Sequence, residues 1–245
     1  MKKISVLLIM LLLILTSCSD SGENVDTSPK LVIKLEQTQL GSTDTDESNY
    51  QYDSNNRMIK IVDRNNKVVI DNVLYDADGN LTKLNQPGGT SDNYEYTNGK
   101  LSKHIRIENN ITVTTVEYFY KNNIIISEKT TDNFNSNSNS RVFNYEYNGN
   151  TVKKVDASNA NNYRVIKHDG KKNPFSGINY LIKALPFSSL GNVIEVKTYS
   201  NGNLSFTTTN TITYDNENYP TKIVTKEING SGNTWGETRI YTYNK

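Results

Sequence analysis

Histidine side chains are the first candidates for chemistry in this chain of 245 residues, and there are only two of them. His104 lies in an alternating run, LSKHIRI, and His168 lies beside a turn. Neither stands at a spacing from a serine, cysteine or acid that is typical of a nucleophilic triad, and the sequence contains no nucleophile elbow or phosphate-binding glycine loop. We therefore expect no catalytic residue, and we interpret both histidines as surface residues.

Acidic residues suggest two further chemistries. Asp76-Ala77-Asp78-Gly79-Asn80 is similar to the start of a calcium loop but lacks its closing glutamate, so a turn is the better interpretation. Two carboxylates roughly 5–9 Å apart can cleave a glycosidic bond, but with 26 acidic residues no pair can be selected. One cysteine and two histidines are too few for a His/Cys zinc site or a disulfide framework. We expect no metal and no cofactor.

Tyrosines are the most numerous binding candidates, at 16 against 6 phenylalanines and 1 tryptophan. Tyrosine combines a large contact area with few rotatable bonds and a hydroxyl, which suits a binding surface. Trp235 is either a sugar-stacking platform or, as we favour, a hairpin anchor. The tyrosines that could face a ligand as a stripe are Tyr52, Tyr75, Tyr96, Tyr120 and Tyr147. The alternative, which we favour, is a cross-strand ladder that packs the wall of a sheet.

The elements that position these tyrosines repeat along the chain. An aromatic pair separated by one residue leads into a turn rich in Asn, Asp and Gly, and a short stretch with lysine follows. The second aromatics fall at 52, 75, 96, 120 and 147, in steps of 23, 21, 24 and 27. Such a pair puts both rings on one face of a strand. The positive φ angles of tight turns are expected at Asn98-Gly99, Asn148-Gly149, Asn201-Gly202 and Asp78-Gly79.

The spacing predicts an all-β fold, an antiparallel up-and-down meander of roughly 14–16 strands of about five residues each. A meander this long has exposed edges unless it closes, so we expect one domain over residues 31–245, curled into a closed or nearly closed barrel. Residues 175–185 break the alternation with helix-like apolar spacing, and Pro186 follows them. This segment is either a short helix or an apolar loop that caps one end of the sheet, or else a ligand lid.

The N-terminal residues have the features of a targeting segment. Lys2 and Lys3 precede an apolar run, Ile4 to Leu15, that is too short for a spanning helix. The four residues Leu15-Thr16-Ser17-Cys18 resemble the lipobox of bacterial lipoproteins. In that family the cysteine becomes the first mature residue and carries a diacylglycerol on its sulfur and an acyl chain on its amine. The alternative is an ordinary secretory signal with an incidental cysteine.

The lipobox resemblance implies a signal peptide over residues 1–17, lipidation at Cys18 and membrane anchoring through the acyl chains. Residues 18–30, small, polar and acidic, are then a flexible tether. The resemblance implies the outer membrane as location and leaves open which face carries the protein.

The hairpins resemble YD-type repeats of bacterial surface proteins. Two further motifs, Asn173-Pro174-Phe175 and Tyr219-Pro220-Thr221-Lys222, complete a likeness over residues 31–245 to an uncharacterised family of Gram-negative lipoprotein domains described as porin-like in fold. That family has no known catalytic residues to carry over. The copy ending at His168 lacks tyrosines, and the turn after Tyr120 lacks glycine, so a regular spiral of identical repeats is not expected.

The net charge and the composition exclude some classes of function. The formal net charge is +1, which excludes a general nucleic-acid binder. Lysines, glutamates and threonines on both faces of short strands argue against a membrane-spanning pore. We expect a non-enzymatic binding or structural module, with a glycan or an envelope protein as possible partner. The alternatives are a carboxylate-dependent envelope hydrolase acting on glycans, and a repeat shell that encloses a partner.

Overall fold

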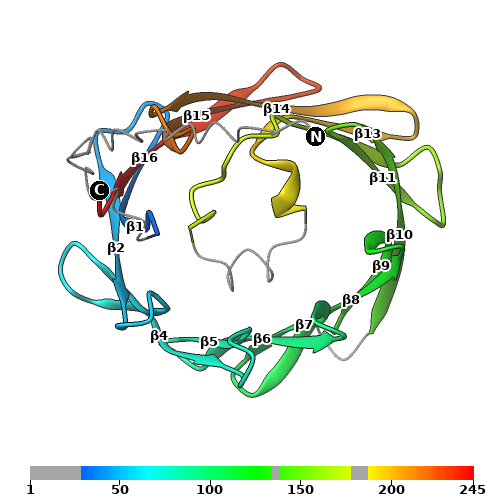
Figure 1. Ribbon diagram of the computed structural model, residues 1–245. Helices are drawn as coiled ribbons and strands as arrows, with labels where there is room; N and C mark the ends of the chain where they lie inside the picture. Colours follow the sequence, from blue (N-terminus) through cyan, green and yellow to red (C-terminus); the bar gives the residue numbers. More distant parts are fainter. Residues whose placement is uncertain (1–28, 134–137, 178–186) are drawn as a thin grey trace, which may run out of the picture.

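The computed structural model describes residues 29–133, 138–177 and 187–245, and these form one all-β barrel. Each of sixteen strands pairs antiparallel with the next, and β16 pairs with β1 to close the ring, as Figure 1 shows along the barrel axis. The strands are β1 (Val32–Gln39), β2 (Thr45–Tyr52), β3 (Met58–Asp63), β4 (Val68–Tyr75), β5 (Leu81–Gln86), β6 (Thr90–Thr97), β7 (Lys100–Glu108), β8 (Ile111–Lys121), β9 (Ile124–Asp132), β10 (Asn139–Asn148), β11 (Thr151–Asp156), β12 (Tyr163–His168), β13 (Val193–Ser200), β14 (Asn203–Tyr214), β15 (Pro220–Asn229) and β16 (Thr234–Tyr243). The predicted closed antiparallel meander is confirmed.

The expected strand length of about five residues is wrong. The strands contain 6 to 12 residues. The longest, β14, carries a run of threonine and asparagine, TTTNT, between its apolar residues. Threonine favours extended backbone because its side chain is β-branched, so the strand continues through this polar run. Strands β7–β10 and β14–β16 reach the roughly 9–11 residues of a membrane-spanning strand, whereas the other strands are shorter.

Asparagine and glycine supply the tight turns, largely as predicted. Asn98-Gly99 and Asn201-Gly202 both have positive φ at each residue, as does the Asn122-Asn123 turn that lacks glycine. Asparagine tolerates this backbone region better than other non-glycine residues. At Asn148-Gly149 only the glycine has positive φ, because Asn148 is still the last residue of β10.

Every even-numbered strand ends at one end of the barrel, next to the start of the preceding odd-numbered strand. Seven of these strands carry a tyrosine at or beside their last residue, namely Tyr52, Tyr75, Tyr96, Tyr120, Tyr147, Tyr214 and Tyr243. The eighth, β12, ends with His168. We call this the tyrosine end. The odd-numbered strands finish at the opposite end, which we call the polar end.

The best-buried side chains form a ring at the tyrosine end. They are the first residues of odd-numbered strands and those next to them, none more than 8% exposed: Val32, Met58, Leu81, Leu101, Ile125, Val152 and Pro220. Tyrosine rings pack on them; Tyr75 and Tyr94, for example, pack against the cluster that contains Met58 and Leu81. Burying one such aliphatic side chain contributes about 1.5–3 kcal/mol, so this ring is the main apolar core.

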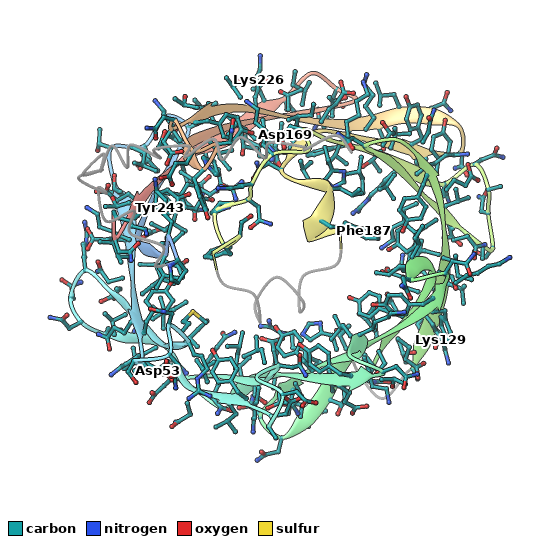
Figure 2. All side chains as sticks on the ribbon, viewed as in Figure 1. Asp53, Lys129, Asp169, Phe187, Lys226 and Tyr243 are labelled. Carbon is teal, nitrogen blue, oxygen red and sulfur yellow. The ribbon has the colours of Figure 1, made fainter. Side chains whose placement is uncertain are left out.

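Side chains alternate between the outer surface and the lumen. Tyr50 contacts Phe175, which belongs to the segment inside the barrel, so Tyr50 and the residues in register with it face the lumen. Lys129 and Lys226 lie on the other face and point outward in Figure 2, whereas Phe187 lies inside the ring. The two faces can therefore be assigned strand by strand from the register.

The connection between β12 and β13 enters the lumen at the tyrosine end (Figure 1). Its described parts are residues 169–177 and 187–192, which include a turn at 174–177 and the short 3-10 helix η2 (Ser188–Leu190). Phe175 packs on Tyr50 with 5.9 Å between ring centroids, and Phe187 packs on Tyr145 with 4.9 Å. Residues 178–186, most of the predicted helix or apolar loop, lie outside the described residues.

Candidate functional site

The predicted tyrosine stripe is built into the barrel wall. Four hydroxyls donate to the backbone carbonyl that begins the neighbouring strand: Tyr52 to Val32 at 2.7 Å, Tyr75 to Met58 at 2.6 Å, Tyr120 to Leu101 at 2.7 Å and Tyr147 to Ile125 at 2.6 Å. Tyr243 makes the same bond to Pro220 at 2.8 Å. These hydroxyls are occupied by structural bonds, while the rings still border the lumen. Contact between the stripe and a ligand stays a prediction.

Tyr96 departs from this pattern, because its buried hydroxyl has no hydrogen-bond partner among the described residues. Burial raises the pKa of Tyr96 to about 12, helped by the nearby negative charge of Asp76. Burial likewise raises the pKa of Tyr50 and of Tyr147 to about 12. These phenols are therefore neutral at physiological pH, which disfavours a role as nucleophiles.

The two histidines occupy different parts of the wall. In the lumen His104 Nε2 lies 2.9 Å from Asp92 Oδ1, and the His104 ring stacks on Tyr94 at 4.9 Å between centroids. His168 is 7% exposed and its Nδ1 lies 3.3 Å from the carbonyl of Asn150. Among the described residues no serine or threonine hydroxyl is bonded to either ring, so neither histidine forms the pair that activates a nucleophile.

A connected polar network lines the lumen between β13 and β1. The Glu237 carboxylate accepts hydrogen bonds from Gln37 and Gln39 and lies 2.9 Å from Arg239 Nε. Arg239 Nη2 donates to Thr225 Oγ1 at 3.2 Å. The chain continues from Thr225 to the Asn210 amide oxygen at 2.7 Å, and Asn210 Nδ2 donates to the Val193 carbonyl at 2.8 Å.

This network is preorganised, because each side chain is held by at least one neighbour on an adjacent strand. A network whose members are mutually bonded keeps a single arrangement without a ligand. Planar amide, carboxylate and guanidinium groups then present fixed donors and acceptors to the lumen.

Trp235 lies beside this network, in a cavity of about 250 Å³. The indole is 40% exposed and packs on Phe206 with 5.3 Å between ring centroids. Glu227 and Glu237 line the same cavity. The ring is thus held from one side by Phe206 and remains accessible, which satisfies both the anchor and the platform interpretation of this residue.

A second cavity, of about 410 Å³, adjoins the first and lies between the wall and the segment inside the barrel. Val193, Asn210 and Arg239 line both cavities. Its apolar lining includes Phe175 and Phe187 from the inner segment and Ile223 and Tyr241 from the wall. We call the two together the β13–β16 cavity; it is apolar toward the tyrosine end and polar toward Trp235.

The inner segment is fixed beside this cavity. Asp169 accepts a hydrogen bond from the Tyr214 hydroxyl and from the backbone N–H groups of Lys171 and Asn192, at 2.8 and 2.9 Å. Burial opposes the negative charge of Asp169, but the bonds from Tyr214 and these donors outweigh it and lower the pKa of the carboxyl. Asn192 Nδ2 also donates to the Lys172 carbonyl at 2.8 Å.

Metal binding finds no support in the part of the chain that the structure describes, where no group of three or more His, Cys, Asp or Glu side chains could hold an ion. No helix within that part is long and apolar enough to cross a membrane. The predicted signal peptide, the lipidation site Cys18 and most of the tether lie outside the described residues.

Sequence reasoning missed the residues of the polar network, namely Gln37, Asn210, Thr225, Glu237 and Arg239. Each is a polar residue within an alternating strand and looks like an ordinary surface residue in the sequence. The available signal was the alternation itself, since Trp235, Glu237 and Arg239 share one face of β16 with Tyr241.

No known family model matches the sequence, and no curated protein does. Two solved structures are similar in fold. A porin-like protein from Bacteroides uniformis ATCC 8492 has 15% sequence identity and a TM-score of 0.54, covering 87% of this chain and 98% of that one. A porin-like protein from Bacteroides vulgatus ATCC 8482 has 13% identity and a TM-score of 0.53, covering 88% and 99%. The chain shares the fold of these porin-like barrels.

Proposed function

We propose that this protein is a lipid-anchored binding module of the cell outer membrane, without enzymatic activity, that holds a glycan in the β13–β16 cavity. The observation that carries this proposal is the accessible Trp235 ring beside a preorganised network of planar polar side chains. A pyranose has an apolar face that stacks on an aromatic ring and hydroxyls that bond to amides, carboxylates and guanidinium groups.

Anchoring is argued from the sequence and from where the described chain begins. Cys18 stands at the lipobox position, and two or more acyl chains give stable membrane attachment. The first described residues lie at the tyrosine end, where Lys30 Nζ is 2.7 Å from Asp215 and also pairs with Glu217. A tether that enters here leaves the polar end of the barrel, with Trp235, available to a ligand.

The charged side chains on the outer face favour a lipid-tethered barrel over one that spans the membrane. Directly opposed residues of neighbouring strands form outward ion pairs, Lys103–Glu95 at 3.8 Å, Lys129–Glu117 at 3.9 Å, Lys153–Glu146 at 3.2 Å and Lys167–Glu195 at 2.8 Å. In water such pairs cost nothing and contribute at most about 1 kcal/mol each. At the middle of a bilayer a lysine costs about 2–4 kcal/mol. Four such pairs around the wall therefore oppose insertion.

The binding proposal is tested on a panel of polysaccharides and envelope extracts, with the wild-type protein and Trp235→Ala compared by affinity electrophoresis and calorimetry. We expect at least one glycan to bind, and its affinity to fall at least tenfold in Trp235→Ala. Phe119→Ala, an exposed aromatic on the outer face, is the matched control and should bind as wild type. A panel without binding above background would refute the proposal.

Anchoring is tested by replacing Cys18 with serine and extracting cells with a phase-separating detergent. The wild-type protein should partition into the detergent phase and Cys18→Ser into the aqueous phase. Retention of Cys18→Ser in the detergent phase would show that something other than the lipid holds the protein in the membrane.

One observation keeps glycan hydrolysis as a second candidate function, because Glu227 and Glu237 line one cavity beside Trp235. Two carboxylates that flank a sugar can act as general acid and base. Incubating the glycan panel with wild-type protein and measuring new reducing ends tests this function. Release that disappears in Glu227→Gln would establish it, and no release from any bound glycan would remove it.

A further inference from the structure

A cavity of about 370 Å³ lies on the lumen wall across β9–β13, away from Trp235. Three of its lining residues are cations, Arg141, Lys154 and Arg164, and we call this cavity the basic pocket. Its other lining includes Phe143 and the polar residues Thr130, Asp156, Asn162, Thr198 and Ser200. The basic pocket thus combines positive charge with hydroxyl and amide groups.

The cations are placed together by the strand register. Lys154 on β11 lies directly opposite Arg164 on β12, so the two side chains share the lumen face as neighbours. Like charges in directly opposed positions repel each other and destabilise the pair. Solvent, opposite charges or a bound anion can offset this repulsion.

Acidic side chains neutralise only part of the positive charge in the basic pocket. Glu128 pairs with Lys154 and also accepts the Tyr145 hydroxyl at 2.6 Å. Arg141 lies 3.7 Å from Asp132. The Asp156 carboxylate instead accepts the backbone N–H and the hydroxyl of Ser158, at 2.8 and 2.6 Å. Arg164 is exposed and has no acidic partner among the described residues.

We propose that the basic pocket binds the carboxylate of an acidic sugar, with the Arg164 guanidinium as its principal partner. A free guanidinium binds a carboxylate with two parallel hydrogen bonds. Arg141 adds positive charge, and the surrounding hydroxyls and the Asn162 amide match the hydroxyls of a sugar ring. This goes beyond the glycan site at Trp235, because it assigns a different site and a charged ligand.

The experiment titrates the full-length protein with D-glucuronate, D-glucose and sodium sulfate and follows the Nε–Hε signals of the six arginines by NMR. Glucuronate should shift the Arg164 signal and saturate it, glucose should not, and sulfate should bind more weakly than glucuronate. Affinity should fall with rising salt, because the site is open to solvent. Equal binding of sulfate and glucuronate would overturn the assignment to an acidic sugar.

Substitutions decide which residue is responsible. Arg164→Gln should weaken glucuronate binding at least tenfold. Arg164→Lys keeps the positive charge but loses the two parallel N–H donors of the guanidinium, so it should weaken binding less. Arg64→Gln, in the exposed turn after β3, removes the same charge elsewhere and should leave binding unchanged. Unchanged affinity in Arg164→Gln would refute the proposal.

The glycan site at Trp235 and the acidic-sugar site at Arg164 can be refuted independently of each other. Arg164 is exposed and has no ion-pair partner among the described residues, so Arg164→Gln should keep the wild-type melting temperature, and this measurement verifies that the variant is folded. Trp235→Ala should weaken binding of the glycan at the β13–β16 cavity at least tenfold and leave glucuronate binding at the basic pocket intact. Loss of glucuronate binding in Trp235→Ala but not in Arg164→Gln would place the acid at the β13–β16 cavity and overturn this inference.

Discussion

A tyrosine hydroxyl at the end of an even-numbered strand bonds to the start of the preceding strand, as Tyr52 of β2 does to Val32 of β1. The accepting carbonyl belongs to the first or second residue of that odd-numbered strand, and a buried carbonyl without a hydrogen bond is costly. The tyrosine donates that bond while its ring covers the buried residue below. At the end of β12 stands His168, whose backbone N–H donates to the Asn150 carbonyl at 2.9 Å and whose Nδ1 lies 3.3 Å from the same carbonyl.

The hydroxyl contribution is measured with Tyr120→Phe, which removes the 2.7 Å bond to the Leu101 carbonyl and keeps the ring. We expect the free energy of unfolding to fall by about 1 kcal/mol. Tyr163→Phe is the control, because Tyr163 stacks on Tyr199 and its hydroxyl has no partner among the described residues. Equal losses in both variants in urea denaturation would contradict this role.

His168 gives the barrel a pH dependence near neutrality. Burial lowers its pKa and outweighs the opposing effects of the Asn150 carbonyl and Asp169. The unfolded chain then binds a proton at a higher pH than the folded chain, so stability falls as pH drops through the usual histidine pKa of about 6.5.

We expect the melting temperature to decrease between pH 7 and pH 5 in the wild-type protein, and this decrease to be smaller in His168→Asn. Differential scanning calorimetry at several pH values checks it. The range stays above the usual carboxyl pKa values, near 4, so loss of Asp and Glu charge contributes little. An identical pH dependence in the two proteins would show that His168 is not responsible.

At the scale of the element, one turn form recurs at the tyrosine end. Asp53, Asp76 and Asp215 each follow a strand-ending tyrosine, and the Asp N–H donates to the carbonyl four residues ahead, at 2.9 to 3.0 Å. The fourth residue of each turn has positive φ and is Asn56, Gly79 or Asn218. The carboxylate accepts backbone N–H groups within the same turn, as Asp53 does from Asn55 and Arg57.

The backbone requirement of this turn is tested at Gly79, where φ is +76° and nothing lies within 4 Å of an added Cβ. Gly79→Ala should lower the free energy of unfolding by roughly 1–2 kcal/mol, since only the left-handed backbone opposes it. Gly230→Ala is the matched control, because its Cβ would meet ordinary contacts at 3.6 Å without positive φ. Urea denaturation of both variants measures the difference.

The sequence pattern predicted these hairpins because turn residues and paired aromatics are local signals. Strand ends were not predictable in the same way, because Thr and Asn in β14 are polar and only tertiary pairing decides that they belong to a strand. Tyr214 ends β14 as the other tyrosines end their strands, but the partner of its hydroxyl is Asp169, 45 residues earlier. Contacts between residues so far apart in the sequence cannot be predicted from the local spacing of residue types.

At the scale of the whole molecule, closure joins the two ends of the described chain. Asn244 Oδ1 accepts the N–H of Leu31 at 2.9 Å, and the Asn244 N–H donates to the Leu31 carbonyl at 3.0 Å. The closed fold was predictable, since a long meander must hide its edges. The candidate site was not, because its members come from β1 and β13–β16 and meet only after the ring closes.

Closure also means that the tyrosines of all hairpins share one cooperative structure. Burial raises the pKa of many of them, including Tyr94, Tyr118 and Tyr145 in addition to Tyr50, Tyr96 and Tyr147. A group whose pKa is raised in the folded state contributes stability that is complete below its unfolded pKa, here about 10, and is lost as pH rises above it. Each such tyrosine therefore favours unfolding in alkali.

Because these contributions add in one closed barrel, we expect stability to fall steeply above pH 10 and the barrel to unfold in a single transition. Absorbance at 295 nm, which reports tyrosine ionisation, should then rise together with the loss of the β-sheet circular dichroism signal. Trp235 fluorescence, from the polar end, should change at the same pH. Ionisation of the buried tyrosines at a lower pH than unfolding would show that their rings are open to water in the folded barrel.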